Sequence, residues 1–237
     1  MPSPALPPSL PPLGTLIPPV IFSIPLPRGW NCWFPPAAVD PPSHSTPPAG
    51  PGARLHKRMG EAVARVARKV NDTVENKTDS LDLANCKLMT FPIGIYKAMR
   101  SVTEGIHCIS LANNELKSLT SRFVTTFNQL RELNLAGNYL HRLPEEITSL
   151  LHLRAINLSR NRFRHFPEHL AAVTTLETID LEENEITEVP VEKLASMASL
   201  RSLNLRANPV NPEVRLLVRP LVPFDLLLSP EEPVPKA

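Results

Sequence analysis

One motif returns along this chain at nearly constant spacing. It reads LNLAGNYLHRLPEEITSL from Leu133, INLSRNRFRHFPEHLAAV from Ile156 and IDLEENEITEVPVEKLASM from Ile179. Self-similarity at a fixed period predicts a stacked array of similar structural units, in which each unit contacts only its neighbours. Arrays of this kind present extended surfaces, so the repeat also directs the search for function.

Six units follow the template LxLxxNxL, with cysteine in place of asparagine in the first. The sixth position of each unit follows the one before it by 28, 24, 23, 23 and 24 residues. The units open with LDLANCKL (81–88), ISLANNEL (109–116), LNLAGNYL (133–140), INLSRNRF (156–163), IDLEENEI (179–186) and LNLRANPV (203–210).

The first half of each unit predicts a short strand. In Leu133-Asn134-Leu135 the alternation places the leucines on one face and Asn134 on the other. Such a strand buries its leucines only when it stacks in parallel with its copies, and each buried leucine then contributes about 1.5–3 kcal/mol. In four units the second half opens with an apolar residue and a proline, which predicts a short helix on the outer side.

The sixth position predicts a buried ladder of hydrogen bonds. The chain turns there, which exposes backbone N–H and C=O groups to an apolar interior, and an asparagine amide can pair with both kinds of group. A buried cysteine is small enough to occupy the same place in the first unit. The ladder residues are Cys86, Asn114, Asn138, Asn161, Asn184 and Asn208.

This pattern resembles the leucine-rich repeat family over residues 79–211. The resemblance implies an α/β solenoid, a short horseshoe of about six repeats with a parallel inner sheet and short convex helices. It also implies a non-enzymatic protein-interaction module, acting as a scaffold or adaptor. Two alternatives stay open: a regulatory subunit that positions a phosphatase or ubiquitin ligase, and a secreted matrix protein or receptor ectodomain. Members of the last class usually carry cysteine-rich caps, and this chain has none.

The segments around the repeats differ in composition. Residues 1–58 are rich in proline and predict a disordered extension, with either no ordered role or a role as a ligand for proline-binding domains. Residues 59–78 space Val63, Val66, Val70 and Val74 at helical intervals, which predicts a helix that caps the first repeat. A membrane-surface helix is the alternative for this segment. Residues 212–237 predict a C-terminal cap, from the apolar stretch at 216–228, followed by a loose tail.

Charge and cysteine usage narrow the partners and the compartment. Residues 1–58 hold four basic groups and one acidic group, which leaves 25 − 4 = 21 basic and 23 − 1 = 22 acidic groups beyond them. This near-neutral balance argues against nucleic acid as a partner. Prolines interrupt the apolar stretch 13–27, which argues against a membrane span. Three cysteines without paired spacing argue against a disulfide framework and for the cytoplasm or nucleus.

Candidate site residues come from the outward positions of the strands, which should line the concave face. We expect a protein partner there, no small-molecule substrate and a monomeric chain. We expect no catalytic, metal or cofactor-binding residue: His165 and His169 have a metal-compatible spacing without a third ligand, and Glu182 to Glu188 form an acidic rim. The candidate docking residues are Asp82, Ser110, Glu132, Asn134, Asn157, Ser159, Asp180, Glu182, Asn204 and Arg206.

Overall fold

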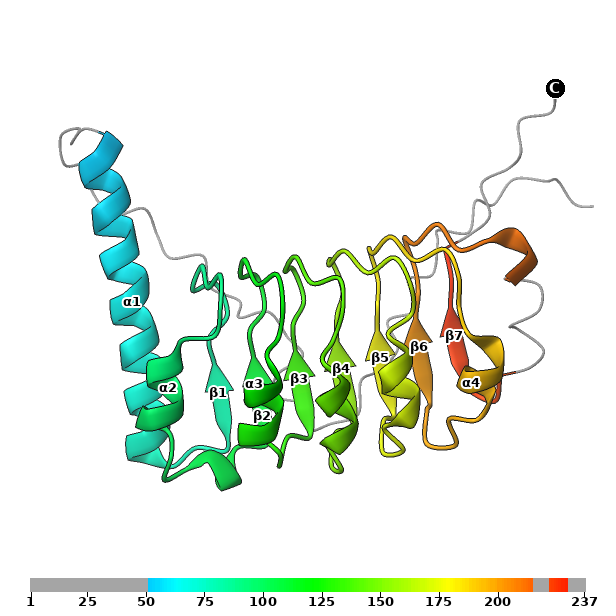
Figure 1. The fold of residues 1–237 in the computed structure, drawn as a ribbon, viewed down its shortest axis with the longest axis horizontal. Coiled ribbons are helices and arrows are strands. Elements are labelled where there is room, and N and C mark those ends of the chain that lie inside the picture. Colours follow the sequence, from blue (N-terminus) through cyan, green and yellow to red (C-terminus); the bar gives the residue numbers. More distant parts are fainter. Residues whose placement is uncertain (1–50, 215–221, 230–237) are drawn as a thin grey trace, which may run out of the picture. The chain divides into compact units, whose positions relative to one another are not determined.

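The repeats build one parallel sheet whose strands follow the order of the sequence (Figure 1). The structure is a computed structural model, and it describes residues 51–214 and 222–229. Neighbouring strands pair residue for residue, so that Leu81, Ile109, Leu133, Ile156, Ile179 and Leu203 lie in one row. The strands are β1 (Ser80–Asp82), β2 (Cys108–Ser110), β3 (Glu132–Asn134), β4 (Ala155–Asn157), β5 (Thr178–Asp180), β6 (Ser202–Asn204) and β7 (Asp225–Leu227).

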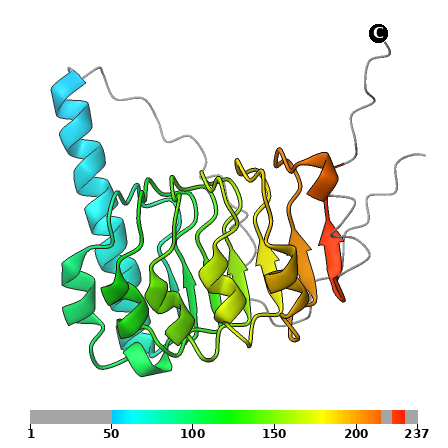
Figure 2. The ribbon, with the colours of Figure 1, turned by 45° about the vertical axis from the view of Figure 1, so that its right-hand side comes forward.

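Short helical segments follow the strands and lie on one side of the sheet, which we call the outer side (Figure 2). A proline precedes four of them, but it occupies the capping position and not the first helical turn. Two of the four are 3-10 helices, a tighter form than the expected α-helix. The segments are α2 (Ile93–Ala98), η1 (Thr103–Gly105), α3 (Ser121–Thr126), η2 (Glu145–Ser149), η3 (Glu168–Ala172) and α4 (Val191–Ala195).

The core lies between the sheet and these segments. The inward leucines and isoleucines of the strands are almost completely buried. In the first two units aromatic rings fill the outer part of the core: the ring of Phe91 lies 5.0 Å from those of Tyr96 and Phe123. Each unit therefore adds one layer to a continuous interior, as parallel stacking requires.

Every unit turns out of its strand through a residue with left-handed backbone. This residue directly precedes the ladder position and has a φ between 53° and 67°. Only Gly137 is a glycine, and a Cβ there would lie 2.5 Å from Asn113 Oδ1. A left-handed conformation costs other residue types about 1–2 kcal/mol. The row consists of Asn85, Asn113, Gly137, Arg160, Glu183 and Ala207.

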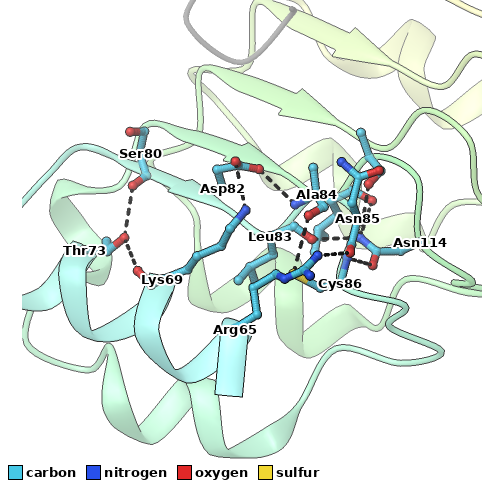
Figure 3. Close-up of polar contacts among 12 residues, drawn as sticks. Arg65, Lys69, Thr73, Ser80, Asp82, Leu83, Ala84, Asn85, Cys86 and Asn114 are labelled. Carbon is cyan, nitrogen blue, oxygen red and sulfur yellow. Dashed lines mark hydrogen bonds and ion pairs between the residues drawn. The ribbon is translucent and has the colours of Figure 1, made fainter. Parts of the chain in front are cut away.

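Helix α1 (Pro51–Asn76) packs against β1 and α2 at the N-terminal end of the array. Lys69 Nζ forms a 3.0 Å ion pair with Asp82 Oδ2, and Arg65 Nη1 donates to the carbonyl oxygen of Asn85 at 3.2 Å (Figure 3). Thr73 Oγ1 lies between the carbonyl oxygens of Lys69 and Ser80, at 3.0 and 3.4 Å. These contacts place a polar cap on the first repeat.

The helix begins eight residues before the expected boundary at residue 59. The prediction that residues 51–58 belong to the disordered extension is wrong, because these residues are helical. Proline suits the first turn of a helix, and the Ala-Arg-Leu-His-Lys-Arg run that follows Gly52 favours helix. The predicted disorder of residues 1–50 lies outside the described residues.

Strand β7 continues the sheet at the C-terminal end. It pairs in parallel with β6, and the N–H of Leu205 donates to the carbonyl oxygen of Leu227 at 2.8 Å. Val222, Phe224, Leu226 and Leu228 pack against the core and are partly buried. The last repeat is thus followed by a seventh strand, which the template LxLxxNxL does not detect.

The two cysteines within the described residues differ. Cys86 is a buried free thiol, and burial raises its pKa, so the thiol is neutral. Cys108 is disulfide-bonded, which is contrary to the expectation of unpaired cysteines at that position. No helix among the described residues is both long and apolar enough to cross a membrane.

Candidate functional site: the inner face of the sheet

The face of the sheet opposite the short helices, here called the inner face, carries a row of Asx side chains with one recurring contact. In each case Oδ1 accepts the backbone N–H two residues further on. Asn134 accepts from Ala136 at 3.0 Å, and Asn157 accepts from Ser159 at 2.9 Å. The same bond recurs at Asp82, Asp180 and Asn204, at 2.9, 3.0 and 3.1 Å. These side chains therefore fix the exit from each strand, a role that residue spacing alone did not reveal.

The middle of the row is not a free docking surface. Ser110, Asn134, Asn157 and Ser159 are buried, with 5 to 8 % of each residue exposed. Glu132 is half-buried. The side chains of the four buried residues offer little area for contact, and the docking role of the ten inner-face residues stays a prediction.

Asp82 at the N-terminal end belongs to the cap. Its Oδ2 is paired with Lys69 of α1, while its Oδ1 accepts the N–H of Ala84 (Figure 3). Both oxygens are thus engaged within the chain. We assign Asp82 to the stability of the first repeat and not to partner binding.

The last two repeats present a different surface. Asp180, Glu182 and Asn204 are half-buried and Arg206 is exposed. Asn204 Nδ2 donates to Glu182 Oε2 at 3.1 Å and bridges the two repeats. Within the described residues neither Asp180 nor Glu182 forms an ion pair. Two neighbouring carboxylates, at the end of β5 and two residues beyond it, therefore lie on the inner face without an ion pair to any described residue. Arg160 is near enough to lower the pKa of Asp180 without pairing with it.

Burial opposes the ionisation of Asp180. Burial raises the pKa of Asp180 to about 6, the neighbouring Glu182 carboxylate raises it further, and the N–H of Glu182 opposes both effects. Ionised Asp180 is therefore less stable in the folded chain than it is in water. A cation of a partner that approached Asp180 and Glu182 would relieve this cost.

The inner-face position two residues after the Asx row also differs between the N-terminal and C-terminal repeats. Ala84, Ala112 and Ala136 form a small buried cluster, with 3 to 8 % of each residue exposed. The equivalent positions of the next three repeats are Ser159, Glu182 and Arg206. The side chains thus grow longer and more charged toward the C-terminal end of the inner face.

The ladder asparagines use both ends of their amides. Asn161 Oδ1 accepts the N–H of Leu140 in the preceding repeat at 3.0 Å. Its Nδ2 lies 2.9 to 3.1 Å from the carbonyl oxygens of Leu135, Leu158 and Ser159. Asn114, Asn138, Asn184 and Asn208 repeat this arrangement and are all buried.

Cys86 shows why the first unit departs from the template. Its Sγ lies 3.5 Å from the carbonyl oxygen of Ala84, a contact within its own unit. No repeat precedes it, so no N–H of an earlier turn requires an acceptor. A side chain with a single weak donor is sufficient there.

The other candidates behave as surface groups. His165 and His169 are exposed and border the same hollow on the outer side of the array. Throughout the described part of the chain no three His, Cys, Asp or Glu side chains are grouped to hold a metal ion. Glu185 pairs with Arg164 at 3.2 Å, so the acidic rim is partly neutralised.

Comparison with known proteins agrees with this geometry. Residues 105–163 and 152–210 match the Leucine rich repeat family. The chain is 70 % identical over 176 residues to leucine-rich repeat-containing protein 20 of Mus musculus, which covers 74 % of this chain and 96 % of the mouse protein. This chain belongs to the leucine-rich repeat family. The Homo sapiens protein of the same name is 68 % identical over 175 residues, which cover 74 % of this chain and 95 % of the human protein.

Solved structures support the same fold. A leucine-rich repeat protein of Leptospira interrogans is 28 % identical with a TM-score of 0.52, and the match spans 59 % of this chain and 34 % of that one. The structure of a TLR13–ssRNA13 complex matches with a TM-score of 0.54 at 20 % identity, over 63 % of this chain and 21 % of that one. The expected family and the expected parallel repeat fold are thus confirmed.

Proposed function

We propose that this leucine-rich repeat protein is a non-enzymatic scaffold or adaptor that docks a protein partner on the C-terminal part of its inner face. The docking residues are Asp180, Glu182, Asn204 and Arg206. The partner contributes at least one lysine or arginine to the two carboxylates. Location in the cytoplasm or nucleus stays a prediction, and the disulfide at Cys108 weighs against it.

One observation carries this proposal: Asp180 holds a charge that its structural task does not need. The equivalent residues of the repeats on either side are Asn157 and Asn204, and they make the same bond to the backbone with a neutral amide. Asp180 makes that bond with a carboxylate whose ionisation burial opposes. A half-buried carboxylate with a perturbed pKa and no ion pair to a described residue is a common feature of binding sites.

The test compares two double variants of the full chain, each of which neutralises two carboxylates. Asp180→Asn with Glu182→Gln removes the inner-face charge and preserves the side-chain shapes. Glu183→Gln with Glu188→Gln removes two exposed charges from the same repeat and serves as the control. Proteins retained by each variant from a cell extract are quantified by mass spectrometry against the wild type.

The proposal expects a set of proteins that the wild type and the control retain in about equal amounts. The inner-face variant should retain these proteins in amounts lower by at least about tenfold. Both variants should unfold cooperatively, which excludes a folding defect as the cause. Equal retention by the two variants would remove the inner face as the working surface.

A further inference from the structure

A second surface of opposite charge lies on the edge between the inner and outer sides, where each repeat leaves its ladder residue. The backbone aligns the repeats there: the N–H of Tyr139 donates to Leu116 at 2.9 Å, and the N–H of Arg162 donates to Leu140 at 2.8 Å. These bonds place equivalent positions of the second, third and fourth repeats side by side. Six exposed residues on this edge, which we call the basic flank, are Lys117, Tyr139, His141, Arg162, Arg164 and His165. Exposed Glu115 of the second repeat lies on the same edge, at the position equivalent to Tyr139 and Arg162.

The cations of the basic flank are held in place but incompletely paired. The guanidinium of Arg162 lies 4.6 Å from the centre of the Tyr139 ring, a distance typical of a cation–π contact. Arg164 pairs with Glu185 at 3.2 Å. Lys117 and Arg162 form no ion pair with any described residue. Stacking leaves the N–H groups at the edge of the Arg162 guanidinium free to donate to the two oxygens of a carboxylate.

The surface is hollowed at these residues. A depression of about 680 Å³ is lined by the whole basic flank together with Glu185. A second depression of about 720 Å³ continues it toward the outer side and shares His141 and His165. Glu145 and Glu146 border the second depression, so the first one has the more positive lining. The two hollows are large enough for several side chains of a bound segment.

We propose that the basic flank binds an acidic segment of a partner protein in extended conformation. Lys117 and Arg162 lie two repeats apart, a separation of roughly 10 Å along the array at the spacing of neighbouring strands. Three residues of extended peptide cover about that distance, so two carboxylates of one short segment can reach both cations. Carboxylates fit better than a single phosphate group, because the cations are spread along the edge and do not converge on one point.

Two features of the flank favour a protein segment over single-stranded RNA. Nucleic-acid binding without sequence preference relies on a continuous positive groove and on aromatic rings free to stack with bases. Here Glu185 and Glu146 interrupt the positive charge, and the one tyrosine ring of the flank is already stacked with Arg162. RNA is nevertheless a competitor that the test must include.

The test uses the full chain and a fluorescein-labelled peptide of about twelve residues that alternates glutamate and serine, with binding followed by anisotropy at low and at physiological ionic strength. The matched peptide carries glutamine at every glutamate. The flank variant is Lys117→Glu with Arg162→Glu. The control is Arg68→Glu with Arg100→Glu, which makes the same change of net charge at exposed positions outside the flank. Thermal unfolding verifies that both variants fold. If the flank variant does not fold, Lys117→Gln with Arg162→Gln replaces it.

The proposal expects the wild type and the control to bind the acidic peptide and not its glutamine analogue, and the flank variant to bind at least about tenfold more weakly. The inner-face variant Asp180→Asn with Glu182→Gln should bind the acidic peptide as the wild type does, so this result is independent of the docking site on the inner face. Equal binding by the flank and control variants, or no binding by the wild type, would overturn the proposal. The proposal would also be overturned if a labelled single-stranded RNA of similar charge bound more tightly than the acidic peptide and lost this binding in the flank variant.

Discussion

Two rows of Asx residues run through this molecule, one in the buried ladder and one on the inner face, and they tolerate change very differently. A ladder residue such as Asn161 accepts an N–H through Oδ1 and donates through Nδ2 to carbonyl oxygens of two repeats. An inner-face residue such as Asn157 uses only Oδ1, toward a single N–H. The ladder therefore requires a carboxamide, whereas the inner face accepts either a carboxamide or a carboxylate.

This difference explains where charge can enter a repeat protein. After the first unit, every ladder position is an asparagine, whereas the inner-face row includes Asp82 and Asp180. Asp82 pairs with the cap helix, and Asp180 stands without such a partner among the described residues. The ladder is fixed by the fold, and the inner face can be adapted to a partner.

The largest expected effect is the loss of one rung. Asn161→Leu leaves the N–H of Leu140 without its acceptor and removes one of the two donors to each of the three carbonyl oxygens around Nδ2. The unpaired N–H costs about 1–3 kcal/mol and the weakened carbonyl groups add to it, so the free energy of unfolding should fall by about 2–4 kcal/mol. Urea unfolding measures this change. The exposed Asn128→Leu is the control and should change it by less than about 0.5 kcal/mol.

A change of intermediate size, with the opposite sign, is expected at Asp180. Its folded pKa of about 6 lies above the usual value near 4, so the carboxylate binds its proton more tightly in the folded state. Stability from this group is therefore present at low pH and is lost as the pH rises from about 4 to 6. Asp180→Asn retains the oxygen and removes the charge, and it should stabilise the chain by about 1–2 kcal/mol at pH 7.5.

The pH dependence and a second aspartate provide the controls for this prediction. The gain in the free energy of unfolding from Asp180→Asn should vanish below about pH 4, where the aspartic acid of the wild type is protonated and therefore as neutral as the asparagine. Asp82→Asn should destabilise instead, by up to about 1 kcal/mol, since it breaks the exposed pair with Lys69. A gain at Asp82 or a loss at Asp180 at neutral pH would mean that the two ends of the inner face do not differ in the way described.

The smallest effect is expected at the left-handed position before the ladder. Ala207 holds a φ of 53°, a conformation that glycine adopts without steric cost. Ala207→Gly should therefore stabilise the chain by roughly 0.5–1 kcal/mol, because the strain relieved exceeds the added entropy of the unfolded state. Thermal unfolding checks it, with Ala64→Gly in helix α1 as a control that should destabilise by a similar amount.

The repeats were predictable because the same pattern occurs once in each of six units. The strand, the ladder and the outer segment each follow from local alternation and from a buried turn that needs hydrogen bonds. Strand β7 escaped prediction since Asp225–Leu227 pairs with β6 without the asparagine that marks a repeat. The left-handed row also escaped, because residue types as different as Arg160 and Ala207 occupy it.

The site was less predictable than the fold. The sequence placed Asn134 and Asp180 on one face, but their hydrogen bonds to the backbone depend on side-chain geometry that spacing does not encode. The basic flank was missed because its members lie in three separate segments when read along the chain. Reading the repeats in columns would have found it: Lys117, His141 and Arg164 occupy one column.

The most direct test of the difference between the rows is one substitution made twice within one repeat. Asn157 and Asn161 are the same residue type, and 7 % of each is exposed. Asn161→Asp loses the donor that serves three carbonyl oxygens, and Asn157→Asp keeps the oxygen that accepts from Ser159. The free energy of unfolding in urea at pH 7.5 should fall by about 3 kcal/mol or more for Asn161→Asp and by no more than about 1.5 kcal/mol for Asn157→Asp. Equal losses at the two positions would contradict the distinction between a ladder fixed by the fold and an inner face free to carry charge.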